Sequence, residues 1–147
     1  MNETQYPSET RDFELAFEEK YARVLINVQK KMVICELLAD YIPIDDFKET
    51  FYRIGDLVKD GDFKKFIFDK RSLRAFHQPT MEWYFIHWKS EMLQYGVTQH
   101  RKILPAEKWF EKMVQIAKGQ ILQNYPDNII DQLDIQYCDS IEEAILK

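Results

Sequence analysis

Glycine, proline and cysteine are all scarce in this sequence. Its 147 residues include four glycines, five prolines and two cysteines. So few glycines and prolines exclude a fibrous or low-complexity chain. Because no two glycines stand close together, the sequence lacks a glycine-rich phosphate loop and a dinucleotide-binding fingerprint, and it contains no Gly-x-Ser-x-Gly or His-Glu-x-x-His motif. We therefore expect no bound cofactor and no catalytic activity.

The two cysteines give no sign of a disulfide or a metal centre. Cys35 and Cys138 each stand in an apolar run, and no Cys-x-x-Cys pair occurs. The sequence therefore predicts two reduced, structural thiols, which are typical of a cytoplasmic protein. His87 and Glu91 have the i, i+4 spacing of a ligand pair. Two ligands are too few for a closed zinc site, so we expect no metal.

Long apolar runs and an excess of positive charge are missing as well. No run approaches the ~18 apolar residues of a membrane span. The net charge of -5 argues against a broad surface for nucleic-acid phosphates. Hydrophobic residues make up 46% and charged residues 31%, the profile of a soluble globular protein. We expect a single domain over residues 13–147, preceded by a frayed polar arm over residues 1–12 that lacks the features of a signal peptide.

Apolar, β-branched runs predict an N-terminal hairpin. Residues 21–28 and 32–39 are such runs, and a short polar break separates them, as between two antiparallel strands. Residues 13–17 alternate apolar and polar side chains and predict an edge strand. An exposed edge strand can pair with a second chain, so a homodimer is one arrangement that the sequence allows.

Helical patterns alternate with three further strands in the rest of the chain. The strands are predicted at residues 63–68, 101–104 and 133–138. Four helices are predicted, three of them from apolar residues at helical spacing and the last over residues 141–146. The apolar faces of the first three consist of Phe47, Phe51, Ile54 and Val58; of Met81, Phe85, Trp88, Met92 and Tyr95; and of Phe110, Met113, Val114, Ala117 and Ile121. Asp46 with Glu49, and Ser140 with Glu143, have capping-box spacing and predict where the first and last helices begin. This order predicts an α/β fold: a mostly parallel sheet with an N-terminal antiparallel hairpin and helices packed on the sheet.

Three stretches carry a resemblance to a known family. They are Phe66–Arg71, Pro79–Trp88 and Ile135–Ala144. The first resembles a strand that ends in Asp-x-Arg, the second a helix that begins near a proline and carries an early tryptophan, and the third a last strand with its closing helix. Residues 21–146 thus resemble the STAS domain of the anti-sigma-factor antagonists. More narrowly, they resemble the SpoIIAA-like proteins, which share their fold class with the CRAL-TRIO lipid-binding domains.

The resemblance implies a regulatory module that acts in the cytoplasm through a protein partner. In classical STAS regulators, a serine at the start of the helix after this strand is phosphorylated, and an aspartate precedes it. His77 and Gln78 stand at those two places here, so the resemblance does not extend to the phosphorylation switch. Thr80 and Ser72 are the nearest hydroxyls and remain as candidate phospho-acceptors.

The segment Asp69–Thr80 is the candidate site. Ligands of open parallel sheets collect outside the carboxyl ends of strands, where Asp69 is predicted to lie. Basic side chains follow in the loop, and a helix N-terminus adds N–H donors. These features predict a pocket for a phosphate, a carboxylate or an acidic partner. The residues of this candidate binding site are Asp69, Lys70, Arg71, Arg74, His77, Thr80 and Trp83.

Two other interpretations of this segment stay open. One is a solvated basic loop in which Asp69 and Arg71 form a structural ion pair. The other is catalysis by Asp69 or His77, which would require a cleft and a strongly shifted titratable group. His100 stands at the start of its strand, so we expect it at the opposite end of the sheet from Asp69.

Aromatic residues of the second predicted helix favour a small anionic or lipid-like ligand as the alternative to a protein partner. Phe85 and Trp88 are expected in the core, which leaves Trp83 and Tyr84 on another side of the helix. An anionic amphiphile would use both the aromatic side chains and the basic loop. A buried apolar cavity next to Arg71 would favour such a ligand, whereas a fully packed core would exclude it.

Overall fold

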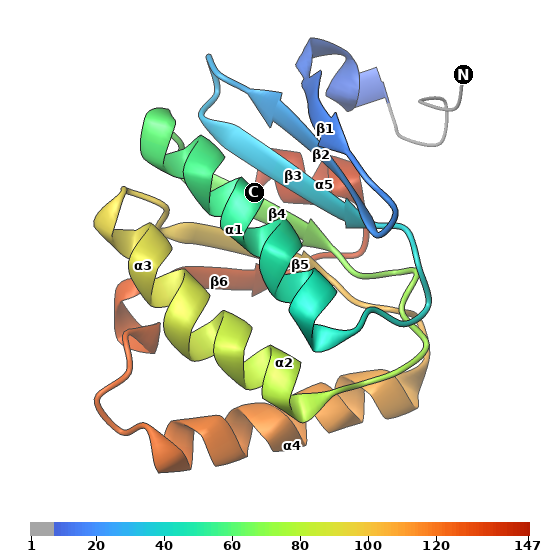
Figure 1. The fold of residues 1–147 in the computed structure, drawn as a ribbon, viewed down its shortest axis with the longest axis vertical. Helices are drawn as coiled ribbons and strands as arrows, with labels where there is room; N and C mark the ends of the chain where they lie inside the picture. The colour runs from blue at the N-terminus through green and yellow to red at the C-terminus, as the bar shows by residue number, and fades with distance from the viewer. Residues whose placement is uncertain (1–7) are drawn as a thin grey trace.

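The computed structural model describes residues 8–147, which form a mixed α/β fold (Figure 1). A 3-10 helix, η2 (Ser8–Asp12), precedes the first strand. The second part of the arm expected over residues 1–12 is therefore a short helix. Residues 1–7 of that arm lie outside the described residues.

Six strands form one sheet in the order of the sequence. The strands are β1 (Glu14–Glu18), β2 (Ala22–Asn27), β3 (Met32–Leu37), β4 (Lys65–Asp69), β5 (Gln99–Ile103) and β6 (Asp134–Tyr137). Antiparallel pairing joins β1, β2 and β3, and parallel pairing joins β3 through β6. The predicted antiparallel hairpin, the edge strand and the parallel remainder of the sheet are confirmed.

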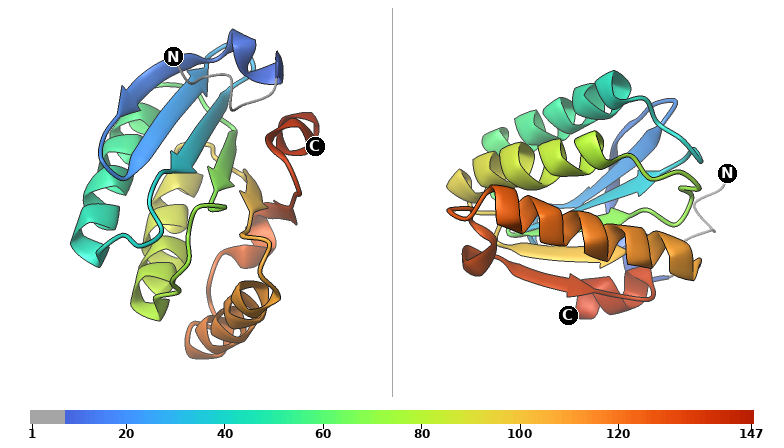
Figure 2. Two further views of the ribbon diagram at one scale, coloured as in Figure 1. Left: turned by 90° about the vertical axis from the view of Figure 1, so that its right-hand side faces the viewer. Right: turned by 90° about the horizontal axis from the view of Figure 1, so that it is seen from below.

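Helices cover both faces of this sheet (Figure 2). One face carries α1 (Ile44–Asp60), α4 (Lys108–Asn124) and, between them, a continuous helix of three segments (Figure 2). These segments are α2 (Gln78–Glu82), the π-helical η3 (Trp83–Trp88) and α3 (Lys89–Gln94). The opposite face carries α5 (Ile141–Leu146), and a 3-10 turn, η4 (Ile130–Gln132), precedes β6. Because successive side chains of a strand point to opposite faces, each strand contributes to both layers.

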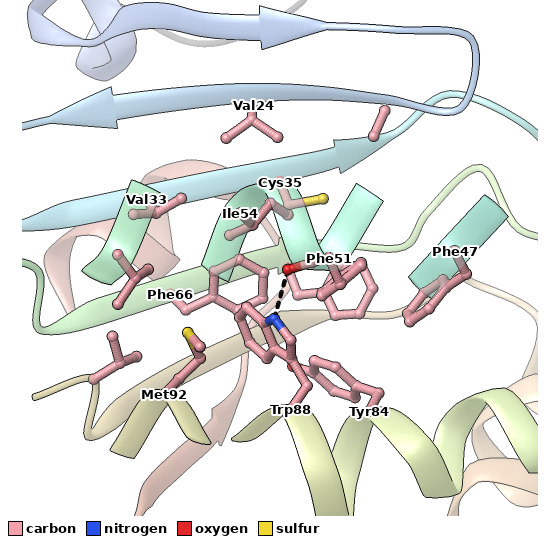
Figure 3. Packing of buried hydrophobic residues seen from close by; sticks show 14 of the residues in the cluster. Val24, Val33, Cys35, Phe47, Phe51, Ile54, Phe66, Tyr84, Trp88 and Met92 are labelled. Atoms are coloured by element: carbon pink, nitrogen blue, oxygen red, sulfur yellow. Dashed lines mark hydrogen bonds between the residues drawn. The ribbon is translucent and has the colours of Figure 1, made fainter. Parts of the chain in front are cut away.

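Aromatic side chains fill the layer between the sheet and helices α1 and α3 (Figure 3). Phe51 meets Trp88 edge to face, with ring centroids 5.0 Å apart, and Trp88 Nε1 donates a hydrogen bond to the Phe51 carbonyl oxygen at 2.8 Å. Phe47 stacks on Phe51 at 4.3 Å. The predicted apolar face of α1 is confirmed, since Ile54 and Val58 are buried with these two residues. Each such side chain contributes about 1.5–3 kcal/mol of burial free energy.

The two predicted capping boxes have different outcomes. Ser140 Oγ accepts a hydrogen bond from the Glu143 N–H at 3.1 Å, and α5 begins directly after Ser140 as predicted. Helix α1 begins directly after Pro43 and has no side-chain cap, so the capping box at Asp46 is wrong. The extended backbone of Pro43 leads into the helix earlier than expected. Asp46 therefore lies in the first turn, where its charge suits the positive end of the helix.

The helix over Gln78–Gln94 differs from the regular α-helix that its spacing predicts. Its middle part, η3, has the i→i+5 hydrogen bonds of a π-helix, and it packs between α1 and α4. Its buried surface is therefore wider than one stripe. Tyr84 is 2% exposed, so the expectation that it points away from the core is wrong, whereas the burial of Phe85 and Trp88 is confirmed. Tyr95 follows the end of α3 and is exposed rather than buried.

Two buried cations face α5. Arg101 of β5 donates to the carbonyl oxygen of Lys147 at 2.9 Å. Lys65 of β4 donates to the carbonyl oxygens of Ala144 and Ile145, both at 3.0 Å. These bonds satisfy carbonyl groups at the C-terminal end of the helix, where the helix dipole favours positive charge.

Candidate functional site

Asp69 lies at the end of β4 and is paired with Arg71. Arg71 Nε and Nη2 donate to the two carboxylate oxygens at 2.9 and 2.8 Å, and the Arg71 backbone N–H donates to Oδ1 at 3.1 Å. Asp69 is 3% exposed. This is the structural ion pair that the sequence left open as an alternative, and it engages both oxygens of the carboxylate.

The loop that follows is attached to the end of β3. Ser72 Oγ lies 2.9 Å from the carbonyl oxygens of Leu37 and Ala39. Arg74 Nη1 donates to two carbonyl oxygens of its own loop at 2.7 and 2.8 Å. Ser72 and Arg74 therefore fix the shape of the loop, and the Ser72 hydroxyl points at backbone oxygens rather than at solvent.

His77 is the N-cap residue of α2. Its Nδ1 accepts a hydrogen bond from the Thr80 N–H at 3.3 Å and lies 2.8 Å from Thr80 Oγ1. Pro79 occupies the first turn, as predicted. His77 thus orders the start of this helix, and it holds the Thr80 hydroxyl against its ring.

A cavity of about 60 Å³ opens inside the loop, where β3 and β4 end. Most of its wall is apolar, with side chains that include Leu37, Phe47, Phe68, Phe76, Met81 and Phe110. Its polar groups come from Lys70, His77, Thr80 and two tyrosines. Among the described residues, no carboxylate lines this cavity. It is therefore an apolar cavity with a basic group in its wall.

Lys70 is the buried cation of the cavity. Its side chain is 7% exposed, and its Nζ lies 5.2 Å from the centroid of the Phe68 ring. Burial away from water, followed by the charge of Lys102, lowers the pKa of Lys70 well below its usual value. Within the part of the chain that the structure describes, no acidic side chain forms an ion pair with it.

Two more buried lysines lie behind Lys70, between the sheet and the helices. Lys102 of β5 has its Nζ 5.4 Å from the ring centroids of both Tyr84 and Phe85. Lys89 of α3 approaches the same two rings at 5.1 and 4.6 Å. The two amines interact with each other, and burial lowers the pKa of Lys89 to about 7 and that of Lys102 well below its usual value. The layer thus holds three amines beside aromatic rings.

Several polar atoms of this layer have no hydrogen-bond partner among the described residues. They include Lys89 Nζ, Tyr84 Oη and both ring nitrogens of His100, and all of them are buried. Sequence reasoning missed Lys89 and Lys102 as parts of the site. The available signal was weak: Lys89 follows Phe85 by four residues, so it shares the buried side of its helix, and Lys102 stands in a strand with an apolar residue only at its end.

Arg71 and Arg74 lie outside the cavity. They line a separate depression of about 460 Å³ formed with the start of α4 and the end of β6. Glu107, Glu111 and Asp139 line it too, so its charges are mixed. The cavity thus adjoins Lys70, whereas the cavity that would have favoured a small ligand in the sequence analysis was one next to Arg71.

Trp83 and His100 also lie away from the cavity. Trp83 contacts Phe47 and Tyr52 edge to face, with centroids 6.2 and 5.5 Å apart. His100 pairs with Phe66, near the start of β4, so its predicted separation from Asp69 is confirmed. Of the predicted site residues, the structure brings Lys70, His77 and Thr80 together around one cavity.

Other classes of site find no support in the described residues. No described helix is long and apolar enough to cross a membrane. No group of three or more His, Cys, Asp or Glu side chains in residues 8–147 could hold a metal ion, and the described cysteines are free and buried. No protein-family model and no curated protein matches this chain. The function is therefore argued from the cavity and its lysines.

Proposed function

We propose that this chain is a non-enzymatic binding module for a small anionic or lipid-like ligand, with a carboxylate as the acidic group. The observation that carries the proposal is Lys70, a buried amine in the wall of an apolar cavity that no carboxylate lines. A buried positive charge without a counter-ion is costly, so an acid that enters the cavity supplies a counter-ion and lowers that cost.

The size of the cavity limits the ligand. Its volume of about 60 Å³ is far below the ~300–1,000 Å³ of sites for drug-sized molecules. A carboxylate with a short aliphatic stem fits this volume, whereas a longer chain has to extend past the exposed side chain of Tyr41 at its edge. The apolar wall favours the stem, and Lys70 favours the acid group.

The roles of the other polar residues support a function without catalysis. The Asp69 carboxylate is engaged at both oxygens by Arg71. The ring of His77 is exposed and caps α2 through Thr80. Neither group is placed as a general base in a closed cleft, which is what a catalytic role for these residues requires.

An NMR titration tests the proposed function. We expect butyrate to shift the amide signals of Lys70, Thr80 and their neighbours, and butanol and butylamine to bind much more weakly. Lys70→Met should weaken butyrate binding by about tenfold or more, because a hydrogen bond to a charged group is lost. Lys64→Met is the matched control, since Lys64 is exposed just before β4. Equal binding of butanol, or unchanged binding by Lys70→Met, would contradict the proposal.

A STAS/SpoIIAA-like regulatory module with a protein partner is the second candidate. The observed order of strands and helices supports it, and so does an exposed apolar stripe on α4. Trp109, Met113 and Ile116 have the i, i+4, i+7 spacing of one helix face and are 45%, 42% and 54% exposed. Met113 was expected in the core, so this stripe is a feature that the sequence pattern did not separate from the buried face.

Native mass spectrometry of protein isolated from its own host distinguishes the two candidates. A bound small molecule that disappears in Lys70→Met and persists in a Trp109→Ser, Ile116→Ser variant supports the ligand-binding module. A bound polypeptide with the opposite dependence supports the regulatory module. Covalent phosphate on Thr80 or Ser72 would favour the regulatory module with a phosphorylation switch.

A further inference from the structure

The three buried lysines form a cluster beside the cavity. Lys70 follows β4 and lines the cavity, Lys102 lies on the neighbouring strand β5, and Lys89 of α3 approaches the same Tyr84 and Phe85 rings as Lys102. Lys70 interacts with Lys102, and Lys102 interacts with Lys89. Of these three amines, Lys70 is the one that lines the cavity.

This arrangement disfavours a proton on Lys70. Its side chain is buried beside the Phe68 ring, and the amine of Lys102 acts on its charge. Like charges in an apolar environment oppose each other's protonation, and no carboxylate lines the cavity to offset them. At neutral pH, Lys70 therefore carries an unprotonated amine in a much larger fraction than an exposed lysine does. A desolvated lysine beside another cationic group is an activated nucleophile.

The cavity also suits the chemistry of an amine with a carbonyl compound. Its mostly apolar wall limits the contact of Lys70 with water, which favours the loss of water that completes an imine. A volume of about 60 Å³ admits a short aldehyde.

We propose that Lys70 binds small aldehydes covalently and reversibly as imines. Its Nζ lone pair adds to the carbonyl carbon, and a proton moves from nitrogen to oxygen to give a carbinolamine. The second N–H proton and the hydroxyl group then leave as water while the C=N bond forms. One aldehyde and one amine give one imine and one water, with no oxidant or reductant. The inference rests on the proposed function only in taking this cavity as the ligand site.

Reductive trapping tests the inference on the full chain. The protein is treated at pH 7 with propanal and sodium cyanoborohydride, which reduces an imine to a stable propylamine, and each lysine is quantified by peptide mass spectrometry. We expect Lys70 to be labelled about tenfold or more faster than the exposed Lys30 and Lys64, because its amine is less protonated. Labelling of Lys70 no faster than that of Lys30 and Lys64 would overturn the proposal.

A variant and a pH series test the role of the lysine cluster. Lys102→Met removes the neighbouring amine and keeps an unbranched side chain, so Lys70 should hold its proton more tightly and label several-fold more slowly. Lys64→Met is the control and should leave the Lys70 rate unchanged. If Lys102→Met does not fold, the wild-type labelling rate against pH decides: it should level off at a lower pH for Lys70 than for Lys30, and coincident profiles would overturn the proposal.

Butyrate separates this inference from the proposed function. Protection of Lys70 from propanal by butyrate supports both, because the two ligands then share the cavity. Fast labelling without protection, together with no butyrate shifts by NMR, supports the imine and contradicts acid binding. Slow labelling of Lys70 with clear butyrate binding overturns the imine and leaves the proposed function in place.

Discussion

Lys70, Lys102 and Lys89 are buried amines whose neighbours are aromatic rings and one another. A charged amine in such surroundings costs several kcal/mol, and the protein avoids part of this cost by giving up protons. Burial is the first cause of the lowered pKa of each of the three. The folded chain is therefore less stable here than it would be with apolar side chains, which is common where a protein keeps a site for a ligand.

Replacing one of these amines should stabilise the protein. Lys89→Met removes a buried Nζ that has no partner among the described residues and keeps a long, flexible side chain. We expect the free energy of unfolding to rise by about 1–4 kcal/mol at pH 7, measured by urea denaturation. Lys112→Met, on the exposed side of α4, should stay within about 0.5 kcal/mol of wild type. A loss of stability in Lys89→Met would mean that its amine has a partner in the folded protein.

The pH dependence of stability follows from the same lysine. The pKa of Lys89 falls from 10.5 to about 7 on folding, so between these values the unfolded chain binds the extra proton and stability rises with pH. One such group contributes at most about 1.4 kcal/mol per pH unit. Burial raises the pKa of the Cys35 thiol, so above pH ~8.5 this group makes stability fall as pH rises. The prediction is therefore tested by urea midpoints measured between pH 7 and 8.5. Lys89→Met should make the rise less steep without abolishing it, because the lowered pKa values of Lys70 and Lys102 contribute to the same rise, and a wild-type midpoint that falls over this range would contradict the prediction.

At the residue scale, the sequence predicted the site only in part. Lys70, His77 and Thr80 were identified because they are close in sequence and precede a helix. Lys89 and Lys102 were not, since their burial depends on the packing of η3 between α1 and α4, which brings together residues that are distant in the chain. No local pattern marks a lysine as buried when its neighbours come from other elements.

At the scale of elements, a buried hydrogen bond fixes the helix α2–η3–α3 to α1, and an ion pair between Lys59 and Glu91 joins the same helices at the surface. Trp88 Nε1 donates to the Phe51 carbonyl oxygen in the middle of the aromatic layer. Trp88→Phe removes this donor and part of the ring volume, so we expect a loss of about 2–4 kcal/mol in the free energy of unfolding. The matched control is Trp109→Phe, whose indole is 45% exposed and which should change stability little. Equal effects of the two variants would show that this contact is not what holds the helix.

Most elements were predictable because they follow simple periodicities. The hairpin, α1, α4 and α5 each show a local pattern of apolar residues or a cap that is sufficient to find them. The boundaries of β5 were shifted, because Gln99 and His100 are polar and resemble a loop, although His100 is fully buried. The π-helical form of η3 was not predicted either, because its widened turn depends on the two helices that flank it.

At the scale of the whole molecule, the free edge of β1 bears on assembly. This strand is first in the sheet order, and its pairing with β2 is interrupted by an irregularity between Leu15 and Phe17. Glu14 and Glu18 place charges on the exposed edge. Bulges and charges of this kind oppose pairing with a second sheet, so we expect a monomer by light scattering at tens of micromolar protein. A dimer that dissociates in Leu15→Lys would contradict this and show pairing through β1.

The second face of the sheet has a consequence for the lifetime of the protein. Helix α5 covers Ile34, Ile67 and Ile103, and its terminal carbonyl groups bind Lys65 and Arg101. Loss of this helix would expose the apolar side chains beneath it and leave the Lys65 amine without its two carbonyl partners, whereas Arg101 would keep its ion pair with Asp134. Unfolding of α5 should therefore direct the chain towards aggregation or proteolysis.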